Sequence, residues 1–266
     1  MKDLSKILVV KELINSLHLL KKHAFWLVIA AFVDAVFFVA WGFFTTPIKD
    51  KILEHAVLIA NELSVLMSQK QAGVLGHLIS PELRPLTGKL VFLIFLLFAV
   101  IYVIYSAFQG TTWWMATQIS EKKWKYRDYL LGFAKVNLIW IGASAIYKFL
   151  DVIIGLRHLL IEKFAPGTPN IAGKVLFVAI ALLSAAAFLS YPTLKAKTIF
   201  KTPLKISAGL ILLSASIYLA TQFILNSISK ASLDLALVAG LILLFPVIIL
   251  IKVYAIRVIS NVHARD

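Results

Sequence analysis

Six stretches of this sequence are apolar over close to the roughly 20 residues that an α-helix needs to cross the hydrocarbon core of a bilayer. Hydrophobic residues make up 61% of the chain and charged residues only 15%, a balance that is not typical of soluble domains. The stretches predict transmembrane helices near residues 24–44, 89–114, 130–157, 171–191, 206–225 and 233–254. We therefore predict an all-α fold, a polytopic integral membrane helical bundle with about six transmembrane helices.

The first part of the chain alternates basic and apolar side chains. The apolar ones follow helical spacing, at Ile7, Val10, Ile14, Leu17 and Leu20. Such a helix is typical of the membrane interface, where its lysines can reach the headgroups. We predict an interfacial amphipathic helix over residues 1–22, followed by a six-helix membrane domain over residues 23–266. A solvated cytoplasmic helix or a frayed tail is the alternative for the first segment.

The segment between the first two predicted spans, residues 45–88, is too polar to cross a membrane. Its apolar residues nevertheless keep a helical period, at Ile52, Ala56, Ile59, Leu63 and Leu66. We predict an amphipathic extracytoplasmic helix in this segment, ended by Pro81 and Pro85.

Basic residues are concentrated on one side of the predicted topology. The chain has 27 Lys and Arg against 13 Asp and Glu. With about six spans, both termini share one side with the loop around Lys122 and the loop around Lys197. Since basic residues collect in cytoplasmic loops, we predict a multi-pass protein of the cell membrane with both termini in the cytoplasm. Anionic headgroups of the lipid bilayer at that face are the predicted partners of these charges, and nucleic acid is not.

The third apolar stretch, from Leu130 to Phe164, carries a line of polar residues at helical steps. The line consists of Asn137, Ser144, Lys148, Asp151, Gly155, His158 and Glu162. All of them fall on one face of an α-helix. A polar face is costly against lipid, so we predict that it packs against other helices or lines a wet space.

Asp34 lies near the middle of the first predicted span. An acid at that depth costs a few kcal/mol unless it is paired, protonated or hydrated. One interpretation is a proton- or cation-binding group. The other is a structural hydrogen-bonding partner for polar groups on the fifth or third span, namely Ser214, Tyr218, Gln222, Asn137 or Ser144.

Further polar residues extend this pattern. Lys148 and Asp151 stand three residues apart, close enough on a helix to form a local salt bridge. Alternatively they form the charged wall of an outward-facing cavity. Gln109 and Gly110, with two tryptophans after them, fit a membrane boundary without any function. The candidate polar pathway therefore comprises Asp34, Asn137, Ser144, Lys148, Asp151, His158, Ser214, Tyr218 and Gln222.

The sequence offers little support for catalysis. It has no cysteine, which excludes thiolate nucleophiles and cysteine-ligated metals, and its 6 histidines form no helical metal pair. Nucleotide-binding glycine loops and hydrolase motifs are also missing. We therefore predict no catalytic residues, no metal site and no cofactor.

The polar seam inside an apolar bundle favours a transporter-like or permease-like function. The alternative is a non-transporting membrane scaffold or assembly factor, which binds a protein partner or lipid, or a second copy of the chain. A lipid-modifying enzyme ranks last, because no acid/base or nucleophile constellation is present.

Overall fold

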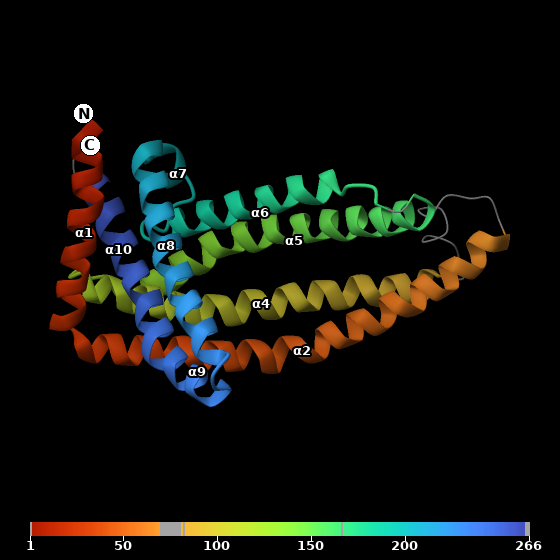
Figure 1. Ribbon diagram of the computed structural model, residues 1–266, viewed down its shortest axis with the longest axis horizontal. Coiled ribbons are helices and arrows are strands. Elements are labelled where there is room, and N and C mark those ends of the chain that lie inside the picture. Colours follow the sequence, from red (N-terminus) through yellow and green to blue (C-terminus); the bar gives the residue numbers. More distant parts are fainter. Residues whose placement is uncertain (1, 70–80, 82, 166, 264–266) are drawn as a thin grey trace. The chain divides into compact units, whose positions relative to one another are not determined.

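The computed structural model describes residues 2–69, 81, 83–165 and 167–263, and in these ranges every regular element is a helix. Figure 1 shows them in chain order. The elements are α1 (Lys2–Lys22), α2 (Ala24–Gln69), α4 (Arg84–Ile119), α5 (Tyr126–Phe164), α6 (Ile171–Ser190), α7 (Thr198–Lys201), α8 (Leu204–Ser229), α9 (Leu233–Ala239), the π-helical turn η1 (Gly240–Leu244) and α10 (Phe245–His263).

Within the described ranges, six helices are long and apolar enough to cross a membrane. They comprise Ala24–Glu62, Arg84–Ile119, Tyr126–Gly155, Ile171–Ser190, Leu204–Ser229 and Leu233–Val262. The all-helical prediction and the number of spans are confirmed, and the fold is that of a multi-pass membrane protein. The interfacial position of the first helix and the orientation in the membrane stay predictions.

The helix of the first span continues well past the predicted end of that span. α2 has 46 residues and includes Pro47, so the chain from Thr45 to Gln69 continues the same helix instead of starting a new one. Proline removes one N–H from the helical ladder, but neighbouring bonds can hold the helix together. Residues 70–80 and 82 of the predicted extracytoplasmic segment lie outside the described residues.

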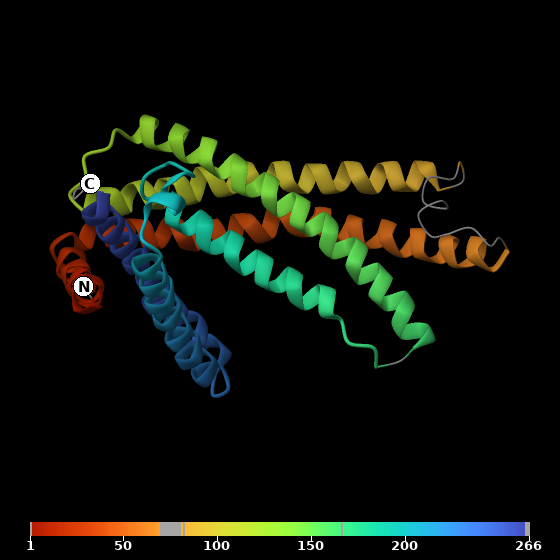
Figure 2. The same cartoon turned by 90° about the horizontal axis from the view of Figure 1, so that it is seen from above.

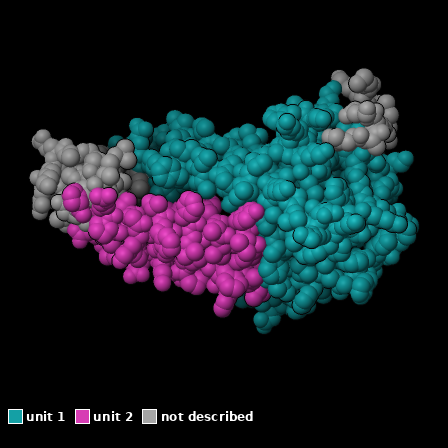
Figure 3. Space-filling view, turned by 180° about the vertical axis from the view of Figure 1, so that it is seen from behind, with its two compact units in different colours: residues 1–36, 106–266 teal, residues 37–105 magenta. Residues whose placement is uncertain are grey.

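The chain divides into two compact units, which Figure 3 shows in different colours. Unit 1 contains residues 1–36 and 106–266, and unit 2 contains residues 37–105. Unit 2 consists of the later part of α2 and the earlier part of α4, where Phe37 and Tyr105 meet edge to face with ring centroids 6.0 Å apart. The candidate site described below belongs to unit 1.

Within unit 1, α1 packs on α10 and α8, and α5 packs along α6 (Figures 1 and 2). α10 supplies much of the core, with Ile249, Val253, Ile256 and Ile259 fully buried. Ahead of α10 the helix widens into η1, next to Pro246, which has no N–H to donate to the carbonyl four residues before it. Pro246 thus closely follows a π-helical turn within the last span.

The side of α1 that packs on the rest of unit 1 is not the apolar side that its spacing identified. Its buried residues are Val9, Glu12, Ser16, Leu19 and Leu20. Val10, Ile14 and Leu17, which the sequence placed on the apolar face, are exposed. The helix is therefore apolar on two sides, and only one of them is covered by α8 and α10.

Candidate functional site

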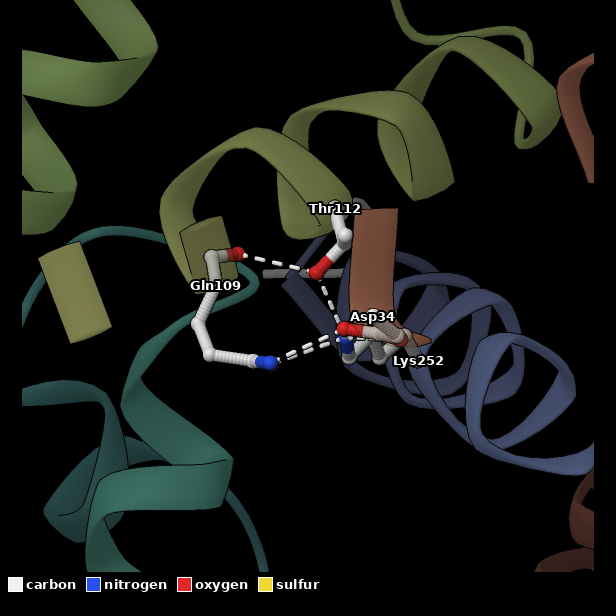
Figure 4. Close-up of polar contacts among 4 residues, drawn as sticks. All are labelled: Asp34, Gln109, Thr112 and Lys252. Carbon is white, nitrogen blue, oxygen red and sulfur yellow. Dashed lines mark hydrogen bonds and ion pairs between the residues drawn. The ribbon is translucent and has the colours of Figure 1, made fainter. Parts of the chain in front are cut away.

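Asp34 of α2 is fully buried and forms an ion pair with Lys252 of α10. The Lys252 ammonium donates to both carboxylate oxygens, at 3.1 Å to Oδ1 and 2.9 Å to Oδ2. The two side chains are only 1% and 6% exposed, respectively. Two helices separated by more than 200 residues of sequence are thus joined by a pair of opposite charges in an apolar setting (Figure 4).

Two residues of α4 complete this polar cluster. Gln109 Oε1 and Thr112 Oγ1 accept hydrogen bonds from the Lys252 ammonium at 2.9 and 2.6 Å. The amide nitrogen of Gln109 donates to Asp34 Oδ1 at 2.8 Å. The three N–H donors of Lys252 therefore form hydrogen bonds to Asp34, Gln109 and Thr112, as expected for a stable buried ammonium. We call these four residues the charge cluster.

The helix ends on one side of the charge cluster are joined by side-chain contacts, and they give a reference point for the position of the cluster along the helices. Lys22 pairs with Glu121 at 2.5 Å, and Lys122 donates to Ser260 Oγ. We call these four residues the end layer. Asp34 is ten residues after the start of α2, Gln109 ten before the end of α4, and Lys252 ten before Val262. At 1.5 Å per helical residue, the charge cluster lies about 15 Å from the end layer.

Fully buried residues lie between the end layer and the charge cluster along each of the three helices. Ala30 lies one turn from Asp34 in α2, and Ala116 and Ile256 lie on the same side of the cluster in α4 and α10; all three are 0% exposed. We call them the plug. Helices α2, α4 and α10 are therefore each fully packed at one position between the charge cluster and the end layer.

Two side chains of the end layer have pKa values below their ordinary values. Lys22 holds the pKa of the exposed Glu121 carboxyl below its ordinary value, through its hydrogen bond and its charge. Burial lowers the pKa of the Lys122 ammonium, because desolvation disfavours the charged form. Both shifts match the contacts that join α1, the loop after α4, and α10.

Asn137 belongs to a second buried network, between α4, α5 and α6. Its amide nitrogen donates to Ser106 Oγ at 2.8 Å, and its oxygen accepts from Tyr191 OH at 3.1 Å. The Tyr191 carbonyl in turn accepts from the fully buried Tyr129 OH at 3.0 Å. The polar start of the α5 seam is therefore packed and hydrogen-bonded in this conformation.

The rest of the α5 seam is more open. Ser144 and His158 are partly exposed, and Lys148 is exposed. Lys148 donates to Asp151 Oδ2 at 2.6 Å, the local pair that their spacing allows, and His158 approaches Glu162 at 4.0 Å. These polar contacts remain within α5 and do not reach the charge cluster.

The predicted residues of α8 fall on two sides of the helix. Ser214 is buried, and its hydroxyl has no hydrogen-bond partner in the described part of the chain. Tyr218 is exposed, and its hydroxyl accepts from Gln222 at 3.1 Å. None of the hydrogen bonds of Asp34 goes to these residues; they go to Lys252 and Gln109.

Lys252, Gln109 and Thr112 were not among the predicted site residues. Lys252 stands near the end of the last predicted span, where a lysine that extends to the headgroups is common. The sequence does contain one usable signal. Asp34 and Lys252 are opposite charges inside two apolar spans, and buried opposite charges tend to pair.

A second inter-helix ion pair lies between α1 and α10. Arg257 Nε donates to Glu12 Oε2 at 2.7 Å, and Asn15 donates to the other carboxylate oxygen at 3.3 Å. Glu12 is buried, whereas Arg257 is about one quarter exposed. This pair attaches α1 to the helix that carries Lys252.

The described side chains form no cluster of three or more His, Asp or Glu that could hold a metal ion. The arrangement offers one carboxylate, one ammonium and two neutral hydrogen-bonding groups, which suit proton or cation chemistry better than group transfer. Comparison with protein family models, with curated proteins and with solved structures gave no match to this chain.

Proposed function

We propose that the protein is a transporter-like membrane protein in which the charge cluster couples proton or cation movement to a change in helix packing. The observation that carries this proposal is the Asp34–Lys252 pair, buried between helices of different spans. Ionisable residues within membrane spans are rare and commonly belong to ion or proton pathways. A depth of about 15 Å from the end layer is half of a hydrocarbon core of about 30 Å.

Protonation of Asp34 provides the coupling step. A proton on the carboxylate removes the counter-charge of Lys252 and weakens the attachment of α10 to α2. Lys252 keeps two neutral acceptors, Gln109 and Thr112, so the ammonium remains hydrogen-bonded. The plug then separates and water enters from the end layer. Release of the proton restores the ion pair and closes the plug.

Water access to the plug tests this proposal without knowledge of the solute. The chain has no cysteine, so single cysteines can replace Ala30, Ala116 and Ile256 in the full-length protein. In proteoliposomes, a membrane-impermeant thiol reagent should label all three from one side. The rate, relative to an exposed loop cysteine at Lys123, should rise as the pH falls.

Matched variants separate gating from general loosening. Asp34→Asn mimics the protonated carboxyl, so labelling of the plug should become high and independent of pH. A cysteine at Phe32, which is on the exposed side of α2, should stay unlabelled because lipid covers it. Protection of all three plug positions at every pH, from both sides, would overturn the transport proposal.

The scaffold alternative is supported by a different observation. Every donor of Lys252 and both oxygens of Asp34 already have partners, so the cluster can also serve as permanent attachment between α2, α4 and α10. A scaffold predicts full protection of the plug in wild type. It also predicts that replacing both charges with apolar residues leaves the partner complex intact.

A further inference from the structure

α1 presents two neighbouring rows of side chains on the side that faces away from α8 and α10. Val10, Ile14 and Leu17 form an apolar row, with steps of four and three residues, and all three are exposed. The next row, one position further along the chain, contains Lys11, His18 and Lys22. An apolar row beside a basic row is the pattern of a helix at the boundary between acyl chains and headgroups.

The direction of α1 agrees with such a position. The chain turns at His23, between α1 and α2. Figures 1 and 2 show from two directions that α1 lies at a large angle to the start of α2. α2 begins a membrane span, so a helix that crosses its first turn lies along the membrane surface instead of through it. The Lys22–Glu121 and Arg257–Glu12 ion pairs hold α1 in this orientation.

The loop after α4, which contacts the end layer, adds further positive charge. Lys123, Lys125 and Arg127 are exposed, together with the ring of Trp124. Two acids lie nearby: Glu121 is paired with Lys22, and Asp128 lies in the first turn of α5. Exposed basic groups with an indole among them match a surface of anionic lipid headgroups in charge and in polarity.

We propose that α1 binds the surface of the bilayer that the protein spans, with Val10, Ile14 and Leu17 among the acyl chains and Lys11 and Lys21 on anionic phospholipid headgroups. Lys21 follows the apolar row by four residues and is exposed. Lys22 of the basic row is paired with Glu121. The occupant is a lipid surface because the exposed Lys11 and Lys21, together with the basic loop after α4, accompany the apolar row. An apolar row alone would fit a second copy of the chain equally well.

Spin-labelled lipids test this placement in the full-length protein. An environment-sensitive fluorophore on Ile14→Cys should be quenched by lipids that carry a spin label in the acyl chain, as strongly as the same probe on the exposed Ile146 of α5. A probe on His18→Cys, one turn along in the basic row, should be quenched much less. A probe at Lys230, in the turn after α8, gives the level for water.

The charge requirement is tested with the headgroup of the spin-labelled lipid. Spin-labelled phosphatidylglycerol should quench the Ile14 probe more strongly than spin-labelled phosphatidylcholine. Lys11→Gln and Lys21→Gln should each lower that preference about fivefold, since one basic residue near a membrane surface is worth about that factor. Lys148→Gln, a charge change on α5, should leave it unchanged.

Two results would overturn the proposal. Equal quenching at Ile14 and His18 would mean that the apolar row does not enter lipid. Quenching of the Ile14 probe by a second labelled copy of the protein, and not by lipid, would assign the row to a dimer contact. Neither result depends on whether the plug opens, so this proposal and the transport proposal fail separately.

Discussion

In the charge cluster, two buried ions are stabilised by each other and by two neutral side chains. Desolvation of each ion costs several kcal/mol, which the pair recovers through contact and through the hydrogen bonds of Gln109 and Thr112. The two charges therefore depend on each other. Loss of one leaves the other buried without a counter-charge, whereas loss of both leaves only neutral groups in the cluster.

Removal of one charge should therefore harm the protein more than removal of both. Asp34→Leu and Lys252→Met should each lower the free energy of unfolding by about 3 kcal/mol or more. The double variant should come within about 1 kcal/mol of wild type, because apolar residues replace the pair. Reversible unfolding in detergent micelles measures the three values. Additive losses in the double variant would show that the two charges do not act as a pair.

Two fully buried tyrosines differ in whether their hydroxyl groups form a hydrogen bond, so their substitution by phenylalanine can be compared. Tyr129 OH donates to the carbonyl of Tyr191, whereas Tyr254 OH has no partner in the described part of the chain. Tyr129→Phe should cost about 1 kcal/mol of unfolding free energy and leave a carbonyl unsatisfied. Tyr254→Phe should leave the free energy of unfolding unchanged or raise it, since it removes a buried hydroxyl that forms no hydrogen bond. Equal losses in both variants would show that Tyr254 has a partner, such as a bound water.

At the level of helices, close packing of α4 on α5 depends on a glycine. A Cβ on Gly110 would lie 2.7 Å from Leu130 Cδ1 and 3.1 Å from the buried ring of Phe133. Gly110→Ala should therefore destabilise the protein by about 1–3 kcal/mol, because the α5 side chains have to move. Gly142→Ala, in α5 with open space around it, should instead stabilise it by up to about 1 kcal/mol through helix propensity. Thermal unfolding of the two variants in the same detergent compares them. A Gly110→Ala protein as stable as Gly142→Ala would contradict this packing.

The helices were predictable from sequence because length and apolarity are local properties. The span predicted over residues 171–191 differs from α6 by a single residue at its end. Helices that continue into polar sequence were less predictable. α2 extends to Gln69, since backbone hydrogen bonds continue a helix whether or not its side chains suit a membrane.

The partners of the site residues were not predictable, because they depend on which helices are neighbours. The sequence singled out Asp34 as an acid near the middle of a span, but its partner is 218 residues away in sequence. The same limit applies to α1. Its apolar spacing identified Val10, Ile14 and Leu17, while the side that packs on protein also contains Glu12, whose charge is satisfied by Arg257. A pattern within one helix cannot distinguish a face covered by lipid from one covered by protein.

At the level of the whole chain, the end layer brings together groups near the start and the end of the sequence. Lys22 precedes the first span and Ser260 is close to the end of the last one, and both contact the loop after α4. Six spans place the two ends of the membrane domain on the same side. The loop after α4 and the chain between α6 and α8 then share that side, and their exposed lysines predict that it faces the cytoplasm.

Two exposed lysines test this orientation in intact cells. Lys123 follows the end layer directly, whereas Lys230 follows α8, whose 26 residues extend about 39 Å from its start. An impermeant thiol reagent should label Lys230→Cys from outside and reach Lys123→Cys only after the cells are permeabilised. The reverse result would place the basic loops outside and contradict the predicted orientation. Labelling of both from outside would contradict the six-span topology, because three spans, α5, α6 and α8, separate the two positions and should place them on opposite sides.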